Sequence, residues 1–244
     1  GQLFSRSREI VDQSVAADLE TLVQRRMNRE PVSRILGRRE FWGLEFELAA
    51  DTLDPRADTE TLVSAVLGLM PQVESCTPRI LDMGTGTGCI LLASLHDWPE
   101  ATGLGSDISE GAVAAASRNA ARLGLTSRAA FEIANWADGL TGPFDIIVSN
   151  PPYISEPEQS TLSPEVLRFD PPVALFGGAD GLDAYRNLLP SARRVIAPQG
   201  RLILEVGASQ REAVAGLLSP AGFAFVAEHR DLGGVARCVV AEPR

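Results

Sequence analysis

Lysine is absent from this chain. All 22 basic residues are arginine, and 32 acidic residues outnumber them, which leaves a net charge of −10 at neutral pH. Schiff-base, pyridoxal and P-loop chemistry each require a lysine, so these classes of enzyme are excluded. The acidic excess also disfavours nucleic acid as a direct partner, because its phosphates are bound by basic side chains.

Cysteine and histidine are scarce and widely spaced. Cys76, Cys89 and Cys238 show neither paired nor metal-type spacing, and His96 and His229 lie far apart in the sequence. We therefore expect no disulfide framework and no metal site. Neither histidine lies in a motif, so we expect both to be structural or solvent-facing, and we expect Cys89 to be a small buried residue.

Long apolar runs are missing as well. No run reaches the length of about 18 residues that a membrane span needs, and no signal peptide opens the chain. We therefore expect a cytoplasmic protein without membrane contact. The first residue is Gly1 rather than methionine, which suggests a trimmed chain. The 244 residues, 45% of them apolar, suit one large α/β domain with a short N-terminal attachment, acting as a monomer.

The hydrophobic pattern divides the chain into an N-terminal unit, residues 1–50, and a main domain, residues 51–244. Apolar residues at helical spacing predict one helix over residues 14–28, and alternation around a glycine predicts a β-hairpin over residues 39–48. The regular alternation of the main domain begins near Arg79.

Strands and helices alternate in the main domain. Strands are expected at residues 79–83, 102–107, 129–134, 144–149, 201–206, 223–228 and 236–241. Helices are expected at residues 58–69, 109–123, 183–196 and 210–218. A further helix is expected after the strand at residues 79–83, ending near residue 96. Strands separated by helices imply right-handed crossovers, so we expect an α/β fold with a doubly wound, mostly parallel, Rossmann-like sheet of seven strands. The last two strands leave no room for a helix between them and should form an antiparallel hairpin.

A glycine loop follows the first of these strands. Its D-x-G-x-G-x-G string consists of Asp82, Gly84, Gly86 and Gly88. Glycines there permit a tight turn and a close approach of the backbone to a ligand at a helix N-terminus, although a simple strand-to-helix turn is the alternative. The string is not the dinucleotide pattern, because Cys89 occupies the place of the third glycine.

Asp107 ends the next strand, where a carboxylate can accept hydrogen bonds from ribose hydroxyls. The alternative for Asp107 alone is a plain N-cap of the following helix. Together, the glycine loop and Asp107 favour a cofactor that carries a nucleoside. The spacing suits S-adenosylmethionine better than NAD, because no pyrophosphate has to be held.

The Asn150-Pro151-Pro152-Tyr153 segment directly follows an apolar strand. It therefore lies at the rim where open α/β sheets bind ligands. Two successive prolines fix the backbone and remove two N–H donors, which leaves a stiff segment that presents acceptors. A proline-rich turn without a function is the alternative.

This segment suits methyl transfer to a planar nitrogen, whose delocalised lone pair makes it a poor nucleophile. The Asn150 side-chain oxygen and the Pro151 carbonyl can accept the two N–H groups and so orient the nitrogen, while Tyr153 offers an aromatic face for stacking. Positioning and charge stabilisation would then account for the rate, without a general base of tuned pKa.

With these motifs the chain resembles class I S-adenosylmethionine-dependent methyltransferases and, more closely, the HemK-like family of protein glutamine N5-methyltransferases, which modify the GGQ glutamine of peptide chain release factors. The resemblance extends from about Glu30 to Val240. It rests on the segments PVSRILGRREFWGL (31–44), PRADTET (55–61), LDMGTGTGCI (81–90), SDIS (106–109), FDIIVSNPPYI (144–154), GGADGLDAYR (177–186) and LEVGASQ (204–210). It implies a class I methyltransferase fold, S-adenosylmethionine as cofactor and a release factor as partner.

The resemblance also implies roles for single residues. The family's cofactor-binding positions fall on Gly84, Thr85, Gly86, Thr87, Gly88, Asp107, Trp136 and Asn150. Asn150 takes the catalytic place, and Pro151, Pro152 and Tyr153 complete the site for the substrate glutamine. Trp136 would lie beside the adenine, although a half-buried core aromatic is the alternative. The chain departs from the family in having Asn135 before this tryptophan, where aspartate is usual, and a single helix before the hairpin, where a docking bundle is usual.

Other substrates pose the same chemical problem. Adenine N6 of nucleic acid is the main alternative, but a flipped base would need a basic groove, which the net charge of −10 disfavours. A glutamine of a ribosomal protein is another. A cofactor-binding module without activity would show damage at Asn150 or in the glycine loop, and neither motif is damaged.

Overall fold

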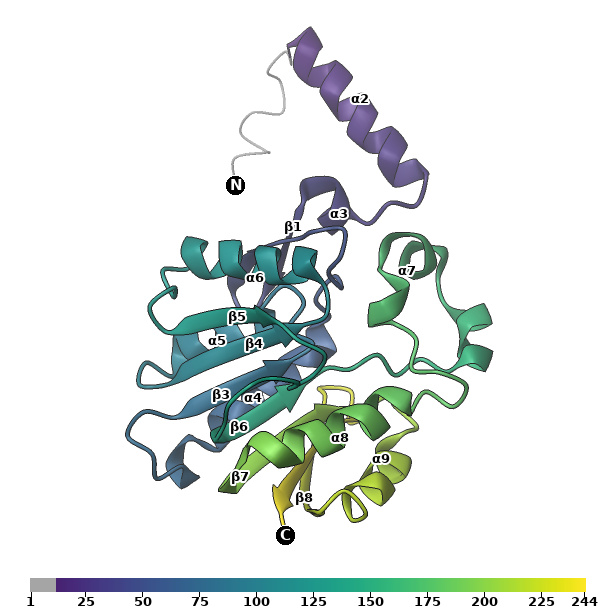
Figure 1. The fold of residues 1–244 in the computed structure, drawn as a ribbon. Coiled ribbons are helices and arrows are strands. Elements are labelled where there is room, and N and C mark those ends of the chain that lie inside the picture. Colours follow the sequence, from purple (N-terminus) through teal and green to yellow (C-terminus); the bar gives the residue numbers. More distant parts are fainter. Residues whose placement is uncertain (1–11) are drawn as a thin grey trace.

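The computed structural model of the protein describes residues 12–244 and is built around one seven-stranded sheet (Figure 1). The strands are β3 (Arg79–Met83), β4 (Thr102–Asp107), β5 (Ala129–Ile133), β6 (Phe144–Ser149), β7 (Ile196–Glu205), β8 (Phe223–Arg230) and β9 (Ala236–Pro243), in the order β5-β4-β3-β6-β7-β9-β8. The first five in this order are parallel, and β9 is antiparallel to both of its neighbours. The predicted doubly wound sheet with an antiparallel C-terminal hairpin is confirmed.

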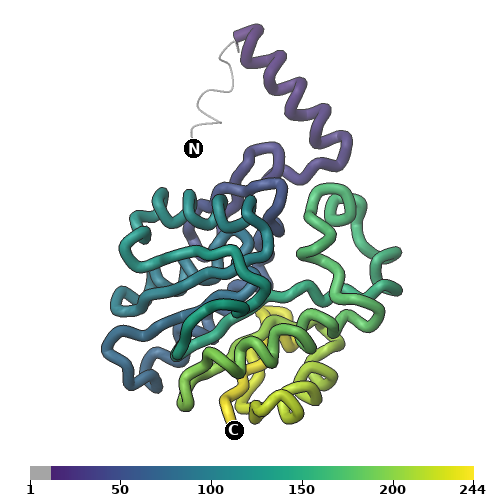
Figure 2. Tube along the Cα trace, viewed as in Figure 1, coloured from purple at the N-terminus to yellow at the C-terminus, as the bar shows by residue number. Residues whose placement is uncertain are grey.

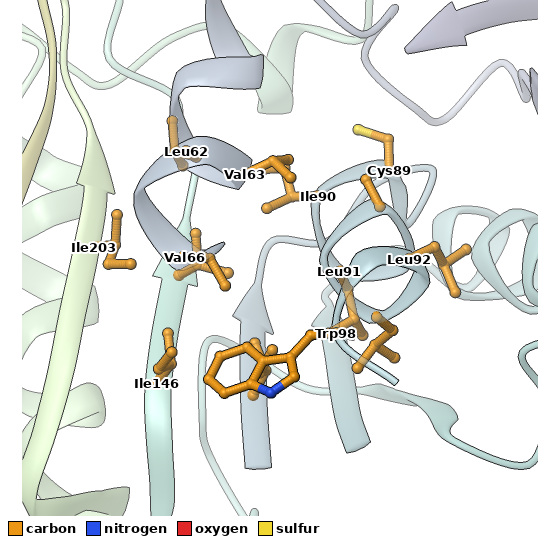
Figure 3. Packing of buried hydrophobic residues seen from close by; sticks show 14 of the residues in the cluster. Leu62, Val63, Val66, Cys89, Ile90, Leu91, Leu92, Trp98, Ile146 and Ile203 are labelled. Carbon is orange, nitrogen blue, oxygen red and sulfur yellow. The ribbon is translucent and has the colours of Figure 1, made fainter. Parts of the chain in front are cut away.

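Helices cover both faces of the sheet. They are α4 (Glu60–Gly68), α5 (Cys89–Asp97), α6 (Glu110–Arg122), α8 (Asp183–Val195) and α9 (Arg211–Leu218). Adjacent strand residues point to opposite faces, so Ile146 joins one apolar cluster with α4 and α5, whereas Ile147 joins another with α8 and α9. Figure 3 shows Leu62 and Val66 of α4 beside the strand residues Ile146 and Ile203. Burial of both faces explains why the central strands read as nearly continuous apolar runs.

Several short helical regions were not predicted. The long connection from β6 to β7 contains α7 (Pro164–Phe169) and the 3-10 turns η3 (Glu156–Thr161) and η4 (Pro172–Ala174), where the sequence indicates only a proline-rich loop. Near the N-terminus, α3 (Val32–Leu36) precedes the hairpin. Helices of one or two turns show too little periodicity to be recognised from a hydrophobic pattern.

The predicted N-terminal helix is α2 (Gln13–Met27), and Asp12 caps it by accepting a hydrogen bond from the Ser14 N–H at 2.9 Å. It extends away from the sheet (Figure 2). The large apolar side chains on this helix are all exposed, and they are Val15, Leu19, Leu22, Val23 and Met27. Within the described part of the chain, no membrane-spanning helix is found, because none is both long and apolar enough.

The predicted β-hairpin consists of β1 (Arg38–Phe41) and β2 (Leu44–Glu47), joined by a tight turn with positive φ at Trp42 and Gly43. Phe41 and Phe46 are fully buried and meet edge to face, with ring centroids 6.2 Å apart. Both belong to the apolar cluster that α4 and α5 form with the sheet. The hairpin therefore packs on the main core, and the division of the chain at residue 50 remains a proposal.

Candidate active site

A cavity of about 430 Å³ lies at the carboxyl ends of the central strands. Parallel sheets bind ligands at this edge, and the volume lies within the range of small-molecule sites. The predicted residues that line it are Gly84, Thr85, Gly86, Thr87, Asp107, Trp136, Asn150, Pro151 and Pro152. The remaining two, Gly88 and Tyr153, are not among the residues that line this cavity.

The glycine loop adopts a conformation that other residues resist. Gly86 and Gly88 have φ of 54° and 78°, in the left-handed region. Gly88 is also the N-cap of α5, and a Cβ added there would lie 3.1 Å from the Ala116 Cβ and 3.3 Å from the Phe131 ring. Gly88 is therefore required for close packing of the helix, while Gly86 exposes its backbone to the cavity.

Asp82 supports this loop from beneath. It is fully buried, and its Oδ2 accepts a hydrogen bond from the Thr85 hydroxyl at 2.7 Å. Burial, with a contribution from the negative charge of Asp107, raises the pKa of Asp82 to about 7. Its Oδ1 has no hydrogen-bond partner among residues 12–244. Asp82 thus holds the loop in shape and does not line the cavity.

Asp107 connects the glycine loop to the start of α6. Its Oδ2 accepts from the Gly86 N–H at 2.9 Å, and its Oδ1 accepts from the Ser109 N–H at 3.0 Å. The helix cap itself is Ser109, whose hydroxyl oxygen accepts from the Ala112 N–H at 3.2 Å. Asp107 is half-buried and faces the cavity, and each carboxylate oxygen keeps a further lone pair for a ligand hydroxyl.

Trp136 lies in a turn after β5, with a positive φ of 55°. The Ser106 hydroxyl donates to its main-chain oxygen at 2.7 Å. The ring lines the cavity on the side of Gly84, and it also packs against the apolar cluster beneath. Trp136 is therefore half-buried, as expected for a core aromatic, and its ring also forms part of the cavity wall.

Asn150 follows the last residue of β6, and the Ser149 hydroxyl holds that strand end by donating to the Met83 carbonyl at 2.6 Å. The Asn150 side chain is half-buried, and its Nδ2 donates to the Thr59 hydroxyl oxygen at 3.2 Å. This hydrogen bond leaves the Asn150 Oδ1 free as an acceptor.

A second cavity, of about 150 Å³, lies on the other side of Asn150. It shares Asn150 and Pro151 with the first cavity, and Tyr153 and Glu205 also line it. Its remaining wall is mainly apolar and comes from the segment that connects β6 to β7, together with Leu53 and the charged Arg56, which also line the first cavity. The site can therefore hold a large ligand on one side of the Asn150 amide and a slender side chain on the other.

Thr59 and Glu205 are site residues that the sequence motifs did not identify. Glu205 ends β7 and is 2% exposed, and its Oε1 accepts a hydrogen bond from the Tyr153 hydroxyl at 3.3 Å. Burial raises the pKa of Glu205 to about 7, and burial together with the Glu205 charge raises the pKa of Tyr153 well above its usual value. Both residues lie in segments that carry the family resemblance, which is the only signal in the sequence that points to them.

The expected exposure of the two histidines and the expected burial of Cys89 are confirmed. His96 and His229 are both exposed and lie outside the two cavities. Cys89 is buried as the first residue of α5, and burial raises the pKa of its thiol.

Two family models match the chain, a methyltransferase domain over residues 77–219 and a PrmC N-terminal domain over residues 1–37. The release factor glutamine methyltransferase of Rhodospirillum rubrum is 52% identical over 244 residues, which cover 100% of this chain and 74% of that protein. The release factor glutamine methyltransferase of Bradyrhizobium diazoefficiens is 46% identical over 241 residues, covering 98% of this chain and 81% of its own.

Solved structures show the same fold. The hMettl16 catalytic domain in complex with MAT2A 3′UTR hairpin 6 superposes with a TM-score of 0.65 at 13% identity, over 86% of this chain and 80% of its own. A methyltransferase from Pyrococcus furiosus superposes with a TM-score of 0.58 at 18% identity, over 89% of this chain and 96% of its own. At such low identity these two structures establish the fold and nothing further.

Proposed function

Since this chain belongs to the family of release factor glutamine methyltransferases, we propose that it transfers a methyl group from S-adenosylmethionine to N5 of the GGQ glutamine of a peptide chain release factor. One observation supports this most directly. Two cavities meet at the Asn150 amide, and the larger one is bordered by the glycine loop and Asp107.

The lining of the larger cavity fits the cofactor. The main chain of Gly84 to Gly86 would approach its methionine part, Asp107 would accept hydrogen bonds from the ribose hydroxyls, and Trp136 would cover the adenine. S-adenosylmethionine bound there would supply a methyl group activated by its positively charged sulfur. No lysine and no pyrophosphate site is needed for such a ligand.

The protein's own part in the reaction is to orient the glutamine amide nitrogen, which is a poor nucleophile. The Asn150 Oδ1 and the Pro151 carbonyl would accept the two N–H groups of the glutamine amide, because two prolines hold these acceptors rigidly. The Tyr153 ring would stack on the planar amide from the smaller cavity. These acceptors would also stabilise the positive charge that the nitrogen gains as its bond to the methyl group forms and the methyl–sulfur bond breaks. S-adenosylhomocysteine would leave, and the methylated nitrogen would lose one proton to solvent.

Mass spectrometry of a release factor incubated with the enzyme and S-adenosylmethionine tests the proposal. We expect one added methyl group on the GGQ glutamine. Asn150→Ala should abolish this product while calorimetry shows nearly unchanged cofactor affinity, because Asn150 acts chiefly on the substrate. Methylation of nucleic acid or of a ribosomal protein, with an unmodified release factor, would reassign the substrate.

We further propose that residues 1–50 help to dock the release factor. The exposed apolar side chains of α2, such as Leu19 and Met27, and the match of residues 1–37 to the PrmC N-terminal domain support this assignment. We expect the enzyme to act in the cytoplasm as a monomer.

A further inference from the structure

The orientation of the Asn150 amide decides what the site can bind. An asparagine side chain presents an acceptor, Oδ1, at one end and a donor, Nδ2, at the other. Only Oδ1 can accept an N–H group of a substrate amide. In the structure Nδ2 donates to the Thr59 hydroxyl oxygen at 3.2 Å, so Oδ1 is the end that remains for the substrate.

Thr59 keeps this orientation only while its oxygen accepts. A hydroxyl has a single proton, which must be donated elsewhere if the oxygen is to accept from Asn150. Thr59 is 2% exposed, and its hydroxyl lowers the pKa of the Glu205 carboxyl, which lines the smaller cavity together with Asn150. A negatively charged acceptor is thus available to the Thr59 proton.

Glu205 has an oxygen free for that proton. Its Oε1 accepts from the Tyr153 hydroxyl, whereas its buried Oε2 has no hydrogen-bond partner among residues 12–244. The Tyr185 hydroxyl donates to the Glu205 main-chain oxygen at 2.7 Å and fixes the end of β7. The titratable or charged side chains that interact with the Glu205 carboxyl from the surrounding elements are Asp58, Cys89, Tyr153, Tyr185, Arg237 and Cys238.

We propose that Glu205 is a positioning residue, whose carboxylate takes the Thr59 proton and thereby keeps the Asn150 Oδ1 turned toward the substrate amide. The inference rests on the proposed function, since it concerns the amide that Asn150 would bind. In the proposed chain of hydrogen bonds, Asn150 donates to Thr59 and Thr59 donates to Glu205. The negative charge of Glu205 sets this direction. An ionised carboxylate only accepts, so it permits only this direction.

Protonation of Glu205 would remove this constraint. A protonated carboxyl can donate to Thr59, which can then donate to the Asn150 Oδ1 and leave Nδ2 facing the substrate. Burial raises the pKa of Glu205 to about 7, so its ionised form becomes dominant above that pH. We therefore expect kcat, measured at saturating cofactor, to rise with pH through about 7.

Thr59→Val and Thr59→Ser test the middle of the chain. Valine keeps the shape but lacks the hydroxyl, so kcat should fall roughly 10- to 100-fold, which corresponds to about 1.4–2.7 kcal/mol of transition-state stabilisation. Serine keeps the hydroxyl and should restore most of kcat. The KM for the release factor and the Kd for S-adenosylmethionine should change little in both variants. Equal loss of kcat in both, or a loss confined to KM, would overturn the proposal.

Glu205→Gln tests the end of the chain. Glutamine is similar in size but carries both a donor and an acceptor, so kcat should fall and its rise with pH near 7 should disappear. Asp82→Asn is the matched control, because Asp82 is the other buried acid with a pKa of about 7. The rise should persist in Asp82→Asn. The proposal is wrong if Glu205→Gln keeps the rise or if Asp82→Asn loses it.

Two measurements separate this inference from the proposed function. If the wild-type enzyme binds S-adenosylmethionine but does not methylate the release factor, the proposed function fails whatever the variants do. Carboxyl titration by carbon NMR of glutamate-labelled enzyme needs no substrate. The Glu205 resonance should titrate near 7 in the wild type and at higher pH in Thr59→Val, since Thr59 lowers this pKa. An unchanged titration would contradict the contact between Thr59 and Glu205.

Discussion

Among the residues of the proposed cofactor site, Asp107 is the one whose side chain we expect to contribute most to cofactor binding. Its two oxygens hold the Gly86 and Ser109 N–H groups, and its remaining lone pairs face the cavity. Asp107→Ala should weaken S-adenosylmethionine binding by roughly 1–3 kcal/mol, the range for hydrogen bonds to a charged group. Isothermal titration calorimetry measures this loss. An unchanged Kd would remove Asp107 from the proposed site.

Asp82 should make the stability of the protein depend on pH. Its pKa is about 7 in the folded protein against 3.8 as the ordinary value, so the folded state binds more protons between these two pH values. The free energy of unfolding should therefore fall as pH rises from about 4 to about 7. Glu205 acts in the same direction, from 4.5 to about 7.

Urea unfolding of Asp82→Asn at several pH values tests this. The variant should lose part of the decrease seen in the wild type, because asparagine has no proton to release. A decrease of unchanged size would show that Asp82 titrates equally in the folded and unfolded states.

At the scale of the element, the turn between β3 and α5 accepts only glycine at Gly88. Alanine there would adopt a φ of 78° and press on Ala116 and Phe131. We expect Gly88→Ala to reduce the free energy of unfolding by roughly 1–3 kcal/mol, the cost of left-handed strain and overpacking.

Gly216→Ala is the control for this substitution. Gly216 lies inside α9, and a Cβ added there meets nothing within 4 Å. Alanine should stabilise this helix by roughly 0.5–1 kcal/mol. Equal effects of the two substitutions on chemical denaturation would contradict the role given to the turn.

At the scale of the whole molecule, Asp170 ties distant segments together. It lies just after α7, and its carboxylate binds Arg34 of α3, with Nη2 to Oδ1 at 2.7 Å, and also Arg56. The side chains of Asp170 and Arg34 are only 4% and 9% exposed. Asp170→Ala would leave the largely buried Arg34 side chain without its carboxylate partner and should destabilise the fold by about 3–5 kcal/mol.

Asp180→Ala provides the comparison, because Asp180 pairs with Arg186 in an exposed position. This substitution should leave the denaturation midpoint unchanged. If Asp170→Ala and the wild type have similar denaturation midpoints, the ion pair between Asp170 and Arg34 does not stabilise the contact between the β6–β7 connection and the N-terminal segment.

Much of the fold could be predicted because its signals are local. The strand residues around Ile146 and Ile147 are apolar in succession, as burial on both faces requires, and Ser109 begins α6 as a capping residue. The short helices α3 and α7 could not be predicted. Their boundaries are decided by contacts such as the one between Arg34 and Asp170, which are 136 residues apart.

The sequence by itself determined the two motifs and their place at the sheet rim, because the backbone freedom of glycine and the fixed φ of proline are properties of single residues. Only the tertiary structure decided which side chains surround Asn150. Thr59 is 91 residues from Asn150, and Glu205 is 52 residues from Tyr153. Their meeting, and the burial that raises the pKa of Glu205, follow from adjacent parallel strands ending at one edge, with α4 packed against the sheet.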